Sequence, residues 1–454
     1  MPIKTLLISV LLLLSPITSF VASADDHDPA EEAAGKFVIL MFMPPDQLED
    51  SLREISETWE PGFTPMMIEL MSVSQAERAY AFLDLLQKKT GQNLGLDPNQ
   101  WFSWWWQQEQ VQAFSYADFK SELYGFIDKK FRGYFGSERV SRIRLDEVRW
   151  GGVVQDGIPP LRQPKMLPAD KASYLDDDNI VFGIEINGDA RAYPKRILAW
   201  HEMFVDEIGG IDFVGVYCTL CGAVILYKTN HNGIQHDLGT SGFLYRSNKL
   251  MYDKATQSLW NTTWGEPVIG PLAEQDIRLE RSFLVTTTWG EWKRRHPESK
   301  VLSLDTGYSR DYGENVAYQQ YFATDELMFS ISTSDDRLKN KDEILALTFP
   351  NHGKATMAIS ASFLQDKPIY VDRLGTLDFV VLTDTSGANR VYETKDHTFT
   401  SYDQDVTLID NAGRQWKLSE DKLQSGDLEL ARLPAHRAFW FGWHAAFPDT
   451  RLIR

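Results

Sequence analysis

The sequence is poor in cysteine, with two residues among 454. A disulfide framework is therefore excluded as the basis of the fold, and a chain with 43% hydrophobic residues can build its cores without one. Basic residues are also scarce relative to acidic ones, because 46 Lys and Arg face 64 Asp and Glu, and the formal net charge is -18. A chain this negative repels phosphate backbones and anionic lipid. We therefore expect no nucleic-acid partner.

Long apolar runs are absent beyond the start of the chain. That start combines Lys4, a largely apolar run from Leu6 to Leu14 and the small-residue triplet Ala22-Ser23-Ala24. This layout predicts a cleavable secretory signal over residues 1–24. A membrane anchor would need about 20 apolar residues, and Ser15 interrupts this run early. We expect a periplasmic or secreted protein with no transmembrane span once the signal has been removed.

The length predicts two or three domains of about 150 residues each. Residues 25–150 are predicted to form a mainly helical domain, because Ser74 with Glu77 and Asp97 with Gln100 have the spacing of capping boxes at helix starts. Apolar residues recur behind these caps at helical spacing in two stripes, one made of Ala79, Phe82, Leu83 and Leu86 and the other of Tyr116, Phe119, Leu123 and Phe126.

Four tryptophans gather in this helical part, at positions Trp101, Trp104, Trp105 and Trp106. Such a cluster can form a carbohydrate-binding platform or pack a core. Apolar aromatic residues on a capped helix usually belong to the core. We predict that these tryptophans seal the helical bundle.

The residue pattern changes over residues 151–454, where short β-branched and aromatic runs are separated by Asn-Gly and Gly-Gly turns. This pattern predicts a strand-rich region. Within it, segment 206–214 recurs as 372–380, with acid, glycine, acid, aromatic and valine in register. Trp292 and the Pro-Glu-Ser that follows it match Trp443 and its Pro-Asp-Thr.

We infer a duplicated module with copies at about residues 175–300 and 340–454. The predicted fold class is α+β, an N-terminal helical domain followed by two pseudo-symmetric β-rich halves. We expect the two halves to pack around a pseudo-twofold axis.

The two copies differ in their cysteines. Asp384 occupies the position that matches Cys218, Gly387 the position that matches Cys221, and a non-histidine residue near Asp366 the position that matches His201. The second copy would therefore fold without a thiol pair. This asymmetry indicates a specialised role for the two cysteines of the first copy.

Cys218 and Cys221 lie in Tyr-Cys-Thr-Leu-Cys-Gly, between apolar runs at residues 213–217 and 223–227. The pattern predicts a β-hairpin with both cysteines at its turn. In thioredoxin-like proteins the N-terminus of a helix lowers the pKa of such a pair. No helix is expected here, so a thioredoxin fold is disfavoured. A thiolate would have to be stabilised by a cation, a histidine or a metal.

His201 is a candidate for that role. A helix that opens at Pro194 and runs to about Phe204 would turn His201 toward the sheet. The chain would then return beside it and bring the imidazole to Cys218 or Cys221. The alternative is a core histidine bonded to a carbonyl group.

Several short stretches from residue 143 onward carry a recognisable pattern: Ile143–Gly152, Asp156–Pro160, Gly188–Pro194, Trp200–Glu202, Tyr217–Gly222, Leu250–Asp253, Arg310–Gly313 and Ala438–Phe441. By these stretches, from about residue 140 to the C-terminus, the chain resembles a bacterial family catalogued as domain of unknown function 3179. The resemblance implies an exported protein of the bacterial cell envelope. It implies no particular activity.

Three hypotheses for the function follow from the residues. The first is thiol/disulfide redox chemistry, with one cysteine attacking an oxidised protein or small-molecule partner, the other resolving the product, and His201 promoting thiolate formation. The second is a copper or zinc site that uses Cys218, Cys221 and His201. Its remaining ligands would come from an open position or from His231, His236, His352 or His436. The third is a binding module without enzymatic activity, in which the cysteines close a structural disulfide.

Overall fold

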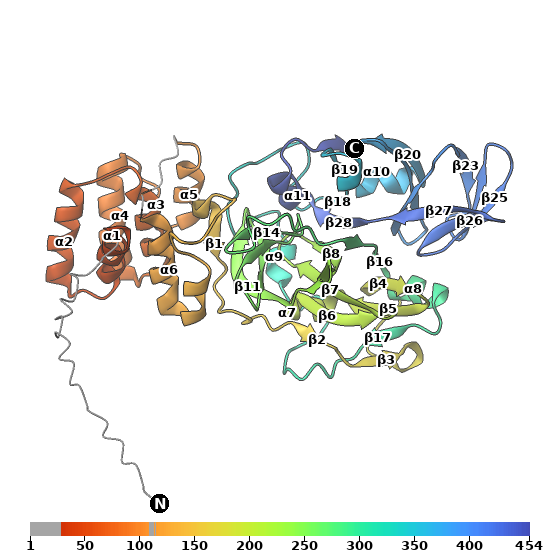
Figure 1. The fold of residues 1–454 in the computed structure, drawn as a ribbon, viewed down its shortest axis with the longest axis horizontal. Helices are drawn as coiled ribbons and strands as arrows, with labels where there is room; N and C mark the ends of the chain where they lie inside the picture. The colour runs from red at the N-terminus through yellow and green to blue at the C-terminus, as the bar shows by residue number, and fades with distance from the viewer. Residues whose placement is uncertain (1–28, 109–112, 114) are drawn as a thin grey trace, which may run out of the picture.

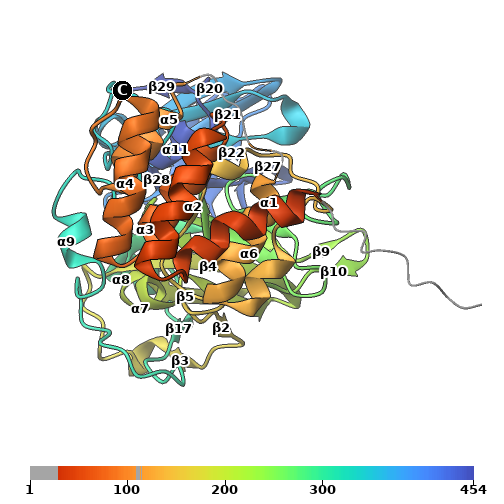
Figure 2. The ribbon, with the colours of Figure 1, turned by 90° about the vertical axis from the view of Figure 1, so that its left-hand side faces the viewer.

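Helices fill the first part of the chain and strands dominate the rest, as the sequence predicts. The computed structural model describes residues 29–108, 113 and 115–454; the predicted signal, residues 1–24, lies outside them. Figure 1 shows the helices at one end of an elongated molecule, and Figure 2 shows the same helices in front of the strands. The helices of this layer are α1 (Pro29–Val38), α2 (Pro45–Glu57), α3 (Phe63–Val73), α4 (Ala76–Thr90), α5 (Pro98–Trp105) and α6 (Tyr116–Ile127).

The predicted helix starts are confirmed in part. The Asp97 side chain caps α5 by accepting a hydrogen bond from the backbone N–H of Asn99 at 2.9 Å. The prediction for Ser74 was wrong, because its hydroxyl donates back to Leu70 O and the residue ends α3 instead of capping α4. Phe126 was also wrongly placed in the core, since it is 58% exposed.

The helical layer does not have a core of its own. Its buried tryptophans, Trp101, Trp105 and Trp106, belong to one apolar cluster that continues into a five-stranded sheet, so their predicted core role is confirmed. Lys120, at 0% exposure, stands at this junction, where its Nζ lies 2.7 Å from the Glu69 carboxylate and donates to Val148 O at 2.9 Å. The sheet has the order β1 (Val148–Trp150), β11 (Leu238–Tyr245), β12 (Asn248–Asp253), β13 (Leu259–Asn261), β14 (Glu266–Ile269).

Two further five-stranded sheets make up the rest of the first β-rich half, together with helices α7 (Lys195–His201) and α8 (Trp289–Arg295). One has the order β15 (Arg281–Ser282), β8 (Ala223–Lys228), β7 (Ile211–Cys218), β6 (Met203–Ile208), β2 (Leu161–Arg162). The other has the order β16 (Val285–Thr288), β4 (Ile180–Ile186), β5 (Asp189–Pro194), β17 (Lys300–Leu302), β3 (Met166–Pro168). A short hairpin adds β9 (Asn230–His231) and β10 (Ile234–Gln235).

The C-terminal half contains a four-stranded and an eight-stranded sheet, with helices α10 (Ala361–Asp366) and α11 (Trp440–Ala446). The smaller sheet has the order β28 (Ala435–Phe439), β18 (Glu343–Thr348), β19 (Thr356–Ser360), β29 (Arg451–Ile453). The larger has the order β20 (Ile369–Leu374), β21 (Leu377–Thr383), β22 (Asn389–Glu393), β27 (Leu428–Leu433), β26 (Lys422–Ser425), β25 (Gln415–Leu418), β24 (Thr407–Asp410), β23 (Phe399–Tyr402).

The helices and strands follow one another in the same order in the two halves of the strand-rich region. In the first, β4, β5, α7, β6, β7 and β8 are followed later by β16, α8 and β17; in the second, β18, β19, α10, β20, β21 and β22 are followed later by β28, α11 and β29. The pairings also agree, because β16 pairs antiparallel with β4 as β28 does with β18, and β17 pairs parallel with β5 as β29 does with β19.

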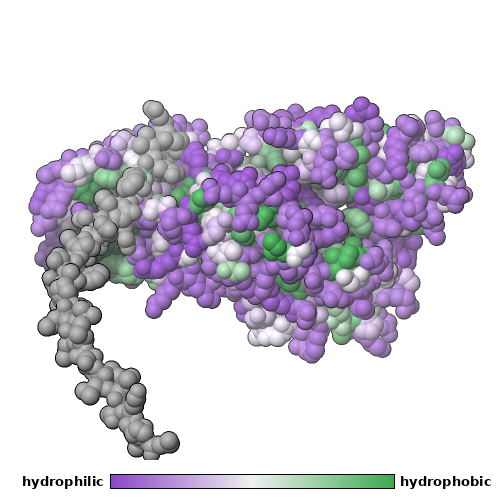
Figure 3. All heavy atoms as spheres, in the orientation of Figure 1, coloured by the Kyte–Doolittle hydropathy of each residue, from purple (hydrophilic) through white to green (hydrophobic). Residues whose placement is uncertain are grey.

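The surface is largely polar. Figure 3 shows a face that is hydrophilic over most of its area, with hydrophobic residues in small separate patches. Within the part of the chain that the structure describes, no helix has the length and apolar content needed to cross a bilayer.

The buried pair at the junction gives a stability prediction. Lys120→Ala would leave the Glu69 carboxylate buried without its cation, and we expect a loss of about 3–5 kcal/mol in the free energy of unfolding measured with urea. The control is Arg53→Ala, because the Arg53–Asp50 pair is exposed (64% and 66%). Such pairs contribute about 0–1 kcal/mol. Equal losses for the two variants would contradict this account of the junction.

Candidate functional site

Both cysteines lie at the turn between two antiparallel strands, as predicted. Strand β7 ends at Cys218, which pairs with Ala223 at the start of β8. The turn is closed by the Cys221 N–H, which donates to Cys218 O at 3.1 Å. Because no helix begins at the pair, any stabilisation of a thiolate must come from local hydrogen bonds and charges.

The C-terminal half packs directly behind this turn. The backbone N–H of Phe439, at the end of β28, donates to Cys221 O at 2.7 Å. Gly442 in α11 leaves room for the second cysteine, because a Cβ there would lie 3.0 Å from Cys221 Cβ and 3.4 Å from its Sγ. Gly222, with φ of +59°, is needed for a related reason, since a Cβ would lie 2.9 Å from the Phe439 ring. The thiol pair is therefore held between the two halves.

The cysteines are free thiols and are almost fully buried, with exposures of 4% for Cys218 and 1% for Cys221. Cys221 Sγ donates to Ser247 O at 3.2 Å. The two thiols are neighbours in this turn, and each influences the ionisation of the other. The structural disulfide of the third hypothesis is thus not formed in this structure.

Cys218 opens onto a small cavity of about 60 Å³, whereas Cys221 is not among the residues that line it. Five polar side chains share this cavity with Cys218, and the rest of the lining is glycine and apolar side chains. The polar residues are Glu202, Thr219, Thr240, Lys249 and Tyr318. Cys218 is therefore the thiol that a small molecule in the cavity would meet.

The charged residues of the cavity are paired with each other. Lys249 Nζ contacts the Glu202 carboxylate, and both side chains are at most 10% exposed. Tyr318 directly precedes the short helix α9 (Gln319–Phe322), and its hydroxyl donates to Glu202 Oε1 at 3.3 Å. Thr219 differs, because its hydroxyl is buried and has no hydrogen-bond partner among the described residues.

The surroundings of the two thiols shift their pKa values in opposite directions. Burial opposes ionisation of Cys218, but hydrogen bonds from the Cys221 thiol and from the backbone amides of Lys249 and Cys221 outweigh burial and the repulsion from Glu202, and the pKa of Cys218 lies below its ordinary value. Burial raises the pKa of Cys221, and the hydrogen bond and charge of Cys218 raise it further. Cys218 is therefore the thiol of the pair that ionises first as the pH rises.

His201 is not brought to the thiols. Its Nδ1 lies 2.9 Å from Pro159 O and its Nε2 lies 2.6 Å from the Tyr312 hydroxyl. Burial lowers the pKa of His201, which favours the neutral ring. Because a carbonyl oxygen can only accept, Nδ1 donates to Pro159 O. These contacts match the core-histidine alternative.

His201 lies away from the thiols because helix α7 ends earlier than predicted. The prediction that it runs to about Phe204 was wrong, because α7 ends at His201 and Phe204 belongs to strand β6. Glu202 adopts a left-handed conformation with φ of 55°, which breaks the helix. The residue after His201 thereby turns into the cavity and takes the place expected for the imidazole.

Sequence reasoning missed Glu202, Lys249 and Tyr318. Glu202 stands inside the Trp-His-Glu stretch that carries the family resemblance, and Lys249 directly precedes Leu-Met-Tyr-Asp. The available signal for these two site residues was a charged residue inside one of these stretches and directly before the other. Nothing in the sequence indicates that the two charges pair across strands β6 and β12.

The predicted copper or zinc site does not fit the residues. Among the residues that the structure describes, no three His, Cys, Asp or Glu side chains come together in a way that would hold a metal ion. His201 uses both ring nitrogens elsewhere, and the His236 ring is engaged with Asp253 at 3.2 Å. The two thiols alone are too few for the tetrahedral ligand set of zinc.

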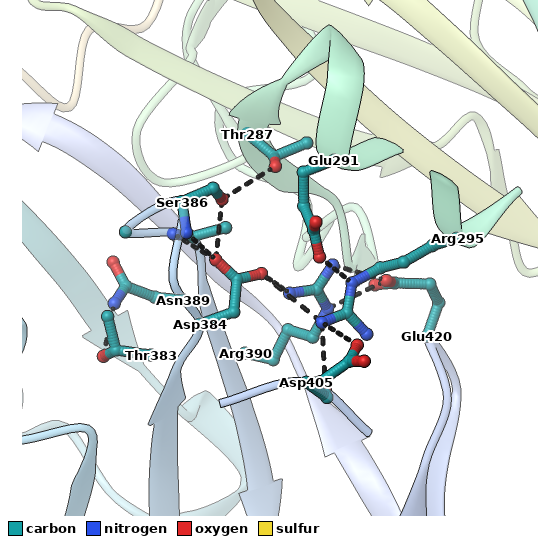
Figure 4. A network of polar contacts seen from close by, with 12 residues as sticks. Thr287, Glu291, Arg295, Thr383, Asp384, Ser386, Asn389, Arg390, Asp405 and Glu420 are labelled. Atoms are coloured by element: carbon teal, nitrogen blue, oxygen red, sulfur yellow. Dashed lines mark hydrogen bonds and ion pairs between the residues drawn. The ribbon is translucent and has the colours of Figure 1, made fainter. Parts of the chain in front are cut away.

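The corresponding turn of the second half carries charges in place of thiols. Gly387 N–H donates to Asp384 O, which repeats the bond between Cys221 and Cys218. Figure 4 shows Asp384 within a network of polar contacts, and its carboxylate lies 2.7 Å from Arg390 Nη1. Asp384 and Arg390 are both fully or almost fully buried. This turn is held by ion pairs and has no side chain that could react with an oxidant.

The chain belongs to the family described as protein of unknown function (DUF3179), whose model matches residues 155–450. This confirms the resemblance seen in the sequence. The matched segment contains both cysteines, Glu202, Lys249 and the C-terminal half as far as residue 450. No curated protein and no solved structure matches the chain.

The assignment of the charge to Cys218 gives a pH prediction. A thiol with a lowered pKa is ionised above that pKa and protonated below it, so the ultraviolet absorbance of thiolate should appear, as pH rises, at a midpoint below the ordinary cysteine value of about 8.5. Cys218→Ala should remove this step. Cys221→Ala should move its midpoint upward, because the thiol that donates to Cys218 is lost. A step that survives in Cys218→Ala would contradict the assignment.

Proposed function

We propose that the protein is a redox-active dithiol, in which Cys218 attacks an oxidised substrate and Cys221 resolves the product. The observation that carries the proposal is the unequal placement of the two sulfurs. Cys218 lines the cavity and has the lowered pKa, while Cys221 lies behind it with a raised pKa. An attacking thiolate and a protonated resolving thiol need this arrangement.

The proposed reaction transfers two electrons from the pair to the substrate. The Cys218 thiolate donates an electron pair to the electrophilic atom of the substrate and expels a leaving group, which takes up a proton. Cys221 then gives up its proton and attacks Cys218 Sγ, so that the second part of the substrate leaves and a Cys218–Cys221 disulfide forms. The substrate is reduced by two electrons and the dithiol is oxidised by two.

The groups around the pair support this use. The hydrogen bonds that hold a thiolate at Cys218 stabilise the reduced form, and stabilising the reduced form makes the disulfide a stronger oxidant. Glu202 and Lys249 neutralise each other, so the thiolate remains the one unpaired charge facing the cavity. His201 has no part in this proposal, and the role expected for it passes to the local hydrogen bonds.

We also propose that the two β-rich halves are copies of one module. Their shared element order supports this, and so do two tryptophans at matching positions. Trp292 Nε1 donates to Ser299 Oγ at 2.8 Å, and Trp443 Nε1 donates to Thr450 Oγ1 at 2.9 Å. Each tryptophan thus bonds to a hydroxyl seven residues further on.

The contacts between the halves are reciprocal, as a pseudo-twofold axis requires. The strand of the second half that ends at Phe439 meets the first turn at Cys221, and the strand of the first half that carries Thr287 meets the second turn at Ser386, with a hydroxyl contact of 3.2 Å. Two equivalent turns are therefore each covered by the opposite half. In this proposal one turn acquired thiols and the other serves the fold.

The proposed compartment is outside the cytoplasm. The signal-like segment at residues 1–24 supports export. An exported dithiol would meet oxidants that a cytosolic protein does not. Determining the first residue of the purified protein tests the proposed export, since removal of the signal would leave a chain that starts near residue 25.

The redox proposal is tested by the reduction potential of the pair. Protein equilibrated in buffers of reduced and oxidised dithiothreitol, then alkylated and weighed by mass spectrometry, should give a potential above about -300 mV, because the reduced state is stabilised by hydrogen bonds. Structural disulfides lie below that value. A lower potential, or thiols that never oxidise, would contradict the proposal.

Folding must be followed in parallel with matched variants. Cys218→Ser should abolish oxidation and keep the far-ultraviolet circular dichroism of the wild type, since a serine fits the turn. Asp384→Asn is the control at the equivalent turn of the second half. It weakens the pair with Arg390 and should leave the potential unchanged. Copper or zinc retained in stoichiometric amount by the purified protein would favour the metal hypothesis instead.

A further inference from the structure

We propose that the oxidant of the Cys218 site is a small, uncharged hydroperoxide, with hydrogen peroxide as the type member. This inference rests on the proposed dithiol function and adds the chemical class of the substrate. It is carried by three features of the cavity: its volume, its unpartnered hydroxyl and its balanced charges.

The volume limits the substrate to a very small molecule. The cavity measures about 60 Å³, and about 10–15 Å³ of such volume holds one water, so there is room for only a few waters. Hydrogen peroxide has two non-hydrogen atoms and fits. A peptide or protein disulfide does not reach the sulfur, because Cys218 is 4% exposed and Met328 and Phe329 also line the cavity.

The hydroxyl of Thr219 supplies a polar contact that the fold itself does not use. Thr219 lines the cavity with Cys218, and its Oγ1 is buried with no hydrogen-bond partner in the described part of the chain. An unpaired buried hydroxyl is unfavourable unless a bound molecule satisfies it. A peroxide both donates and accepts, so it can bond this hydroxyl while its other oxygen meets the sulfur.

The charges favour a neutral molecule. Glu202 and Lys249 are already paired, and the Cys218 thiolate would repel an anion. A neutral hydroperoxide enters without upsetting this balance.

The chemistry balances with the groups present. The Cys218 thiolate attacks one peroxide oxygen, the S–O bond forms as the O–O bond breaks, and the other oxygen leaves as hydroxide and becomes water with the proton of Cys221. The Cys221 thiolate then attacks the Cys218 sulfenic acid, the S–S bond forms, and hydroxide leaves and becomes water with a proton from solvent. One peroxide is reduced to two waters and one disulfide forms.

The test is single-turnover oxidation of the full, reduced protein by hydrogen peroxide, followed by the fluorescence of Trp440 and Trp443, which pack in one cluster with both cysteines. Mass spectrometry counts the remaining thiols. We expect one disulfide per peroxide and a second-order rate constant at least about tenfold above that of free cysteine at the same pH. Cumene hydroperoxide, which is too bulky for the cavity, should react at least about tenfold more slowly than hydrogen peroxide.

Thr219→Val tests the hydroxyl. Valine has nearly the same shape, so we expect unchanged unfolding and a rate with hydrogen peroxide that is lower by roughly tenfold, since one hydrogen bond to the reacting molecule is lost. Thr262→Val is the matched control, because Thr262 is also buried with an unpartnered hydroxyl and does not line the cavity. Its rate should equal that of the wild type. Equal rates for all three proteins would overturn the assignment of Thr219.

The failure of this inference can be told apart from the failure of the dithiol function. If oxidised glutathione or diamide forms the Cys218–Cys221 disulfide but hydrogen peroxide reacts no faster than it does with free cysteine, the peroxide assignment is overturned and the dithiol function stands. If no oxidant forms the disulfide in folded protein, both are overturned. Equal rates for hydrogen peroxide and cumene hydroperoxide would overturn the size argument.

Discussion

The turn that carries the two thiols is held from behind by the C-terminal half of the chain. The hydrogen bond from Phe439 N–H to Cys221 O fixes the turn, and the missing side chain at Gly442 gives Cys221 the space it occupies. Because Cys221 packs into this contact, its Sγ donates to Ser247 O. Cys218 is left at the front, facing the cavity. The front-and-back order of the sulfurs thus depends on packing between the two halves.

Burial destabilises an unpaired charge at this site. The charged groups that the site contains are therefore ones that local contacts stabilise. Glu202 and Lys249 form a pair, and one thiolate is stabilised by a thiol and two backbone amides. The turn at Asp384 in the second half meets the same constraint with Asp384 and Arg390, which are also buried and paired. One turn buries two thiols and the other an ion pair. We propose that this difference separates a reactive turn from a structural one.

Much of the architecture could be predicted from the sequence because its signals are local. The hairpin at Cys218, the cap at Asp97 and the buried tryptophans follow from residue type and spacing. The cavity could not be predicted, since Glu202 and Lys249 are 47 residues apart and meet only in the folded protein. The position of His201 depended on where one helix ends, and a single left-handed residue decided it. Such ends are set by tertiary packing, which spacing does not report.

The central claim is that Cys218 attacks and Cys221 resolves, and trapping the first product tests it most directly. Each cysteine is replaced by serine in turn, the folded variants are treated with hydrogen peroxide, and peptides are mapped for sulfenic acid. The account predicts an adduct on Cys218 in Cys221→Ser and no adduct on Cys221 in Cys218→Ser. An adduct on Cys221, or none on either cysteine, would contradict it.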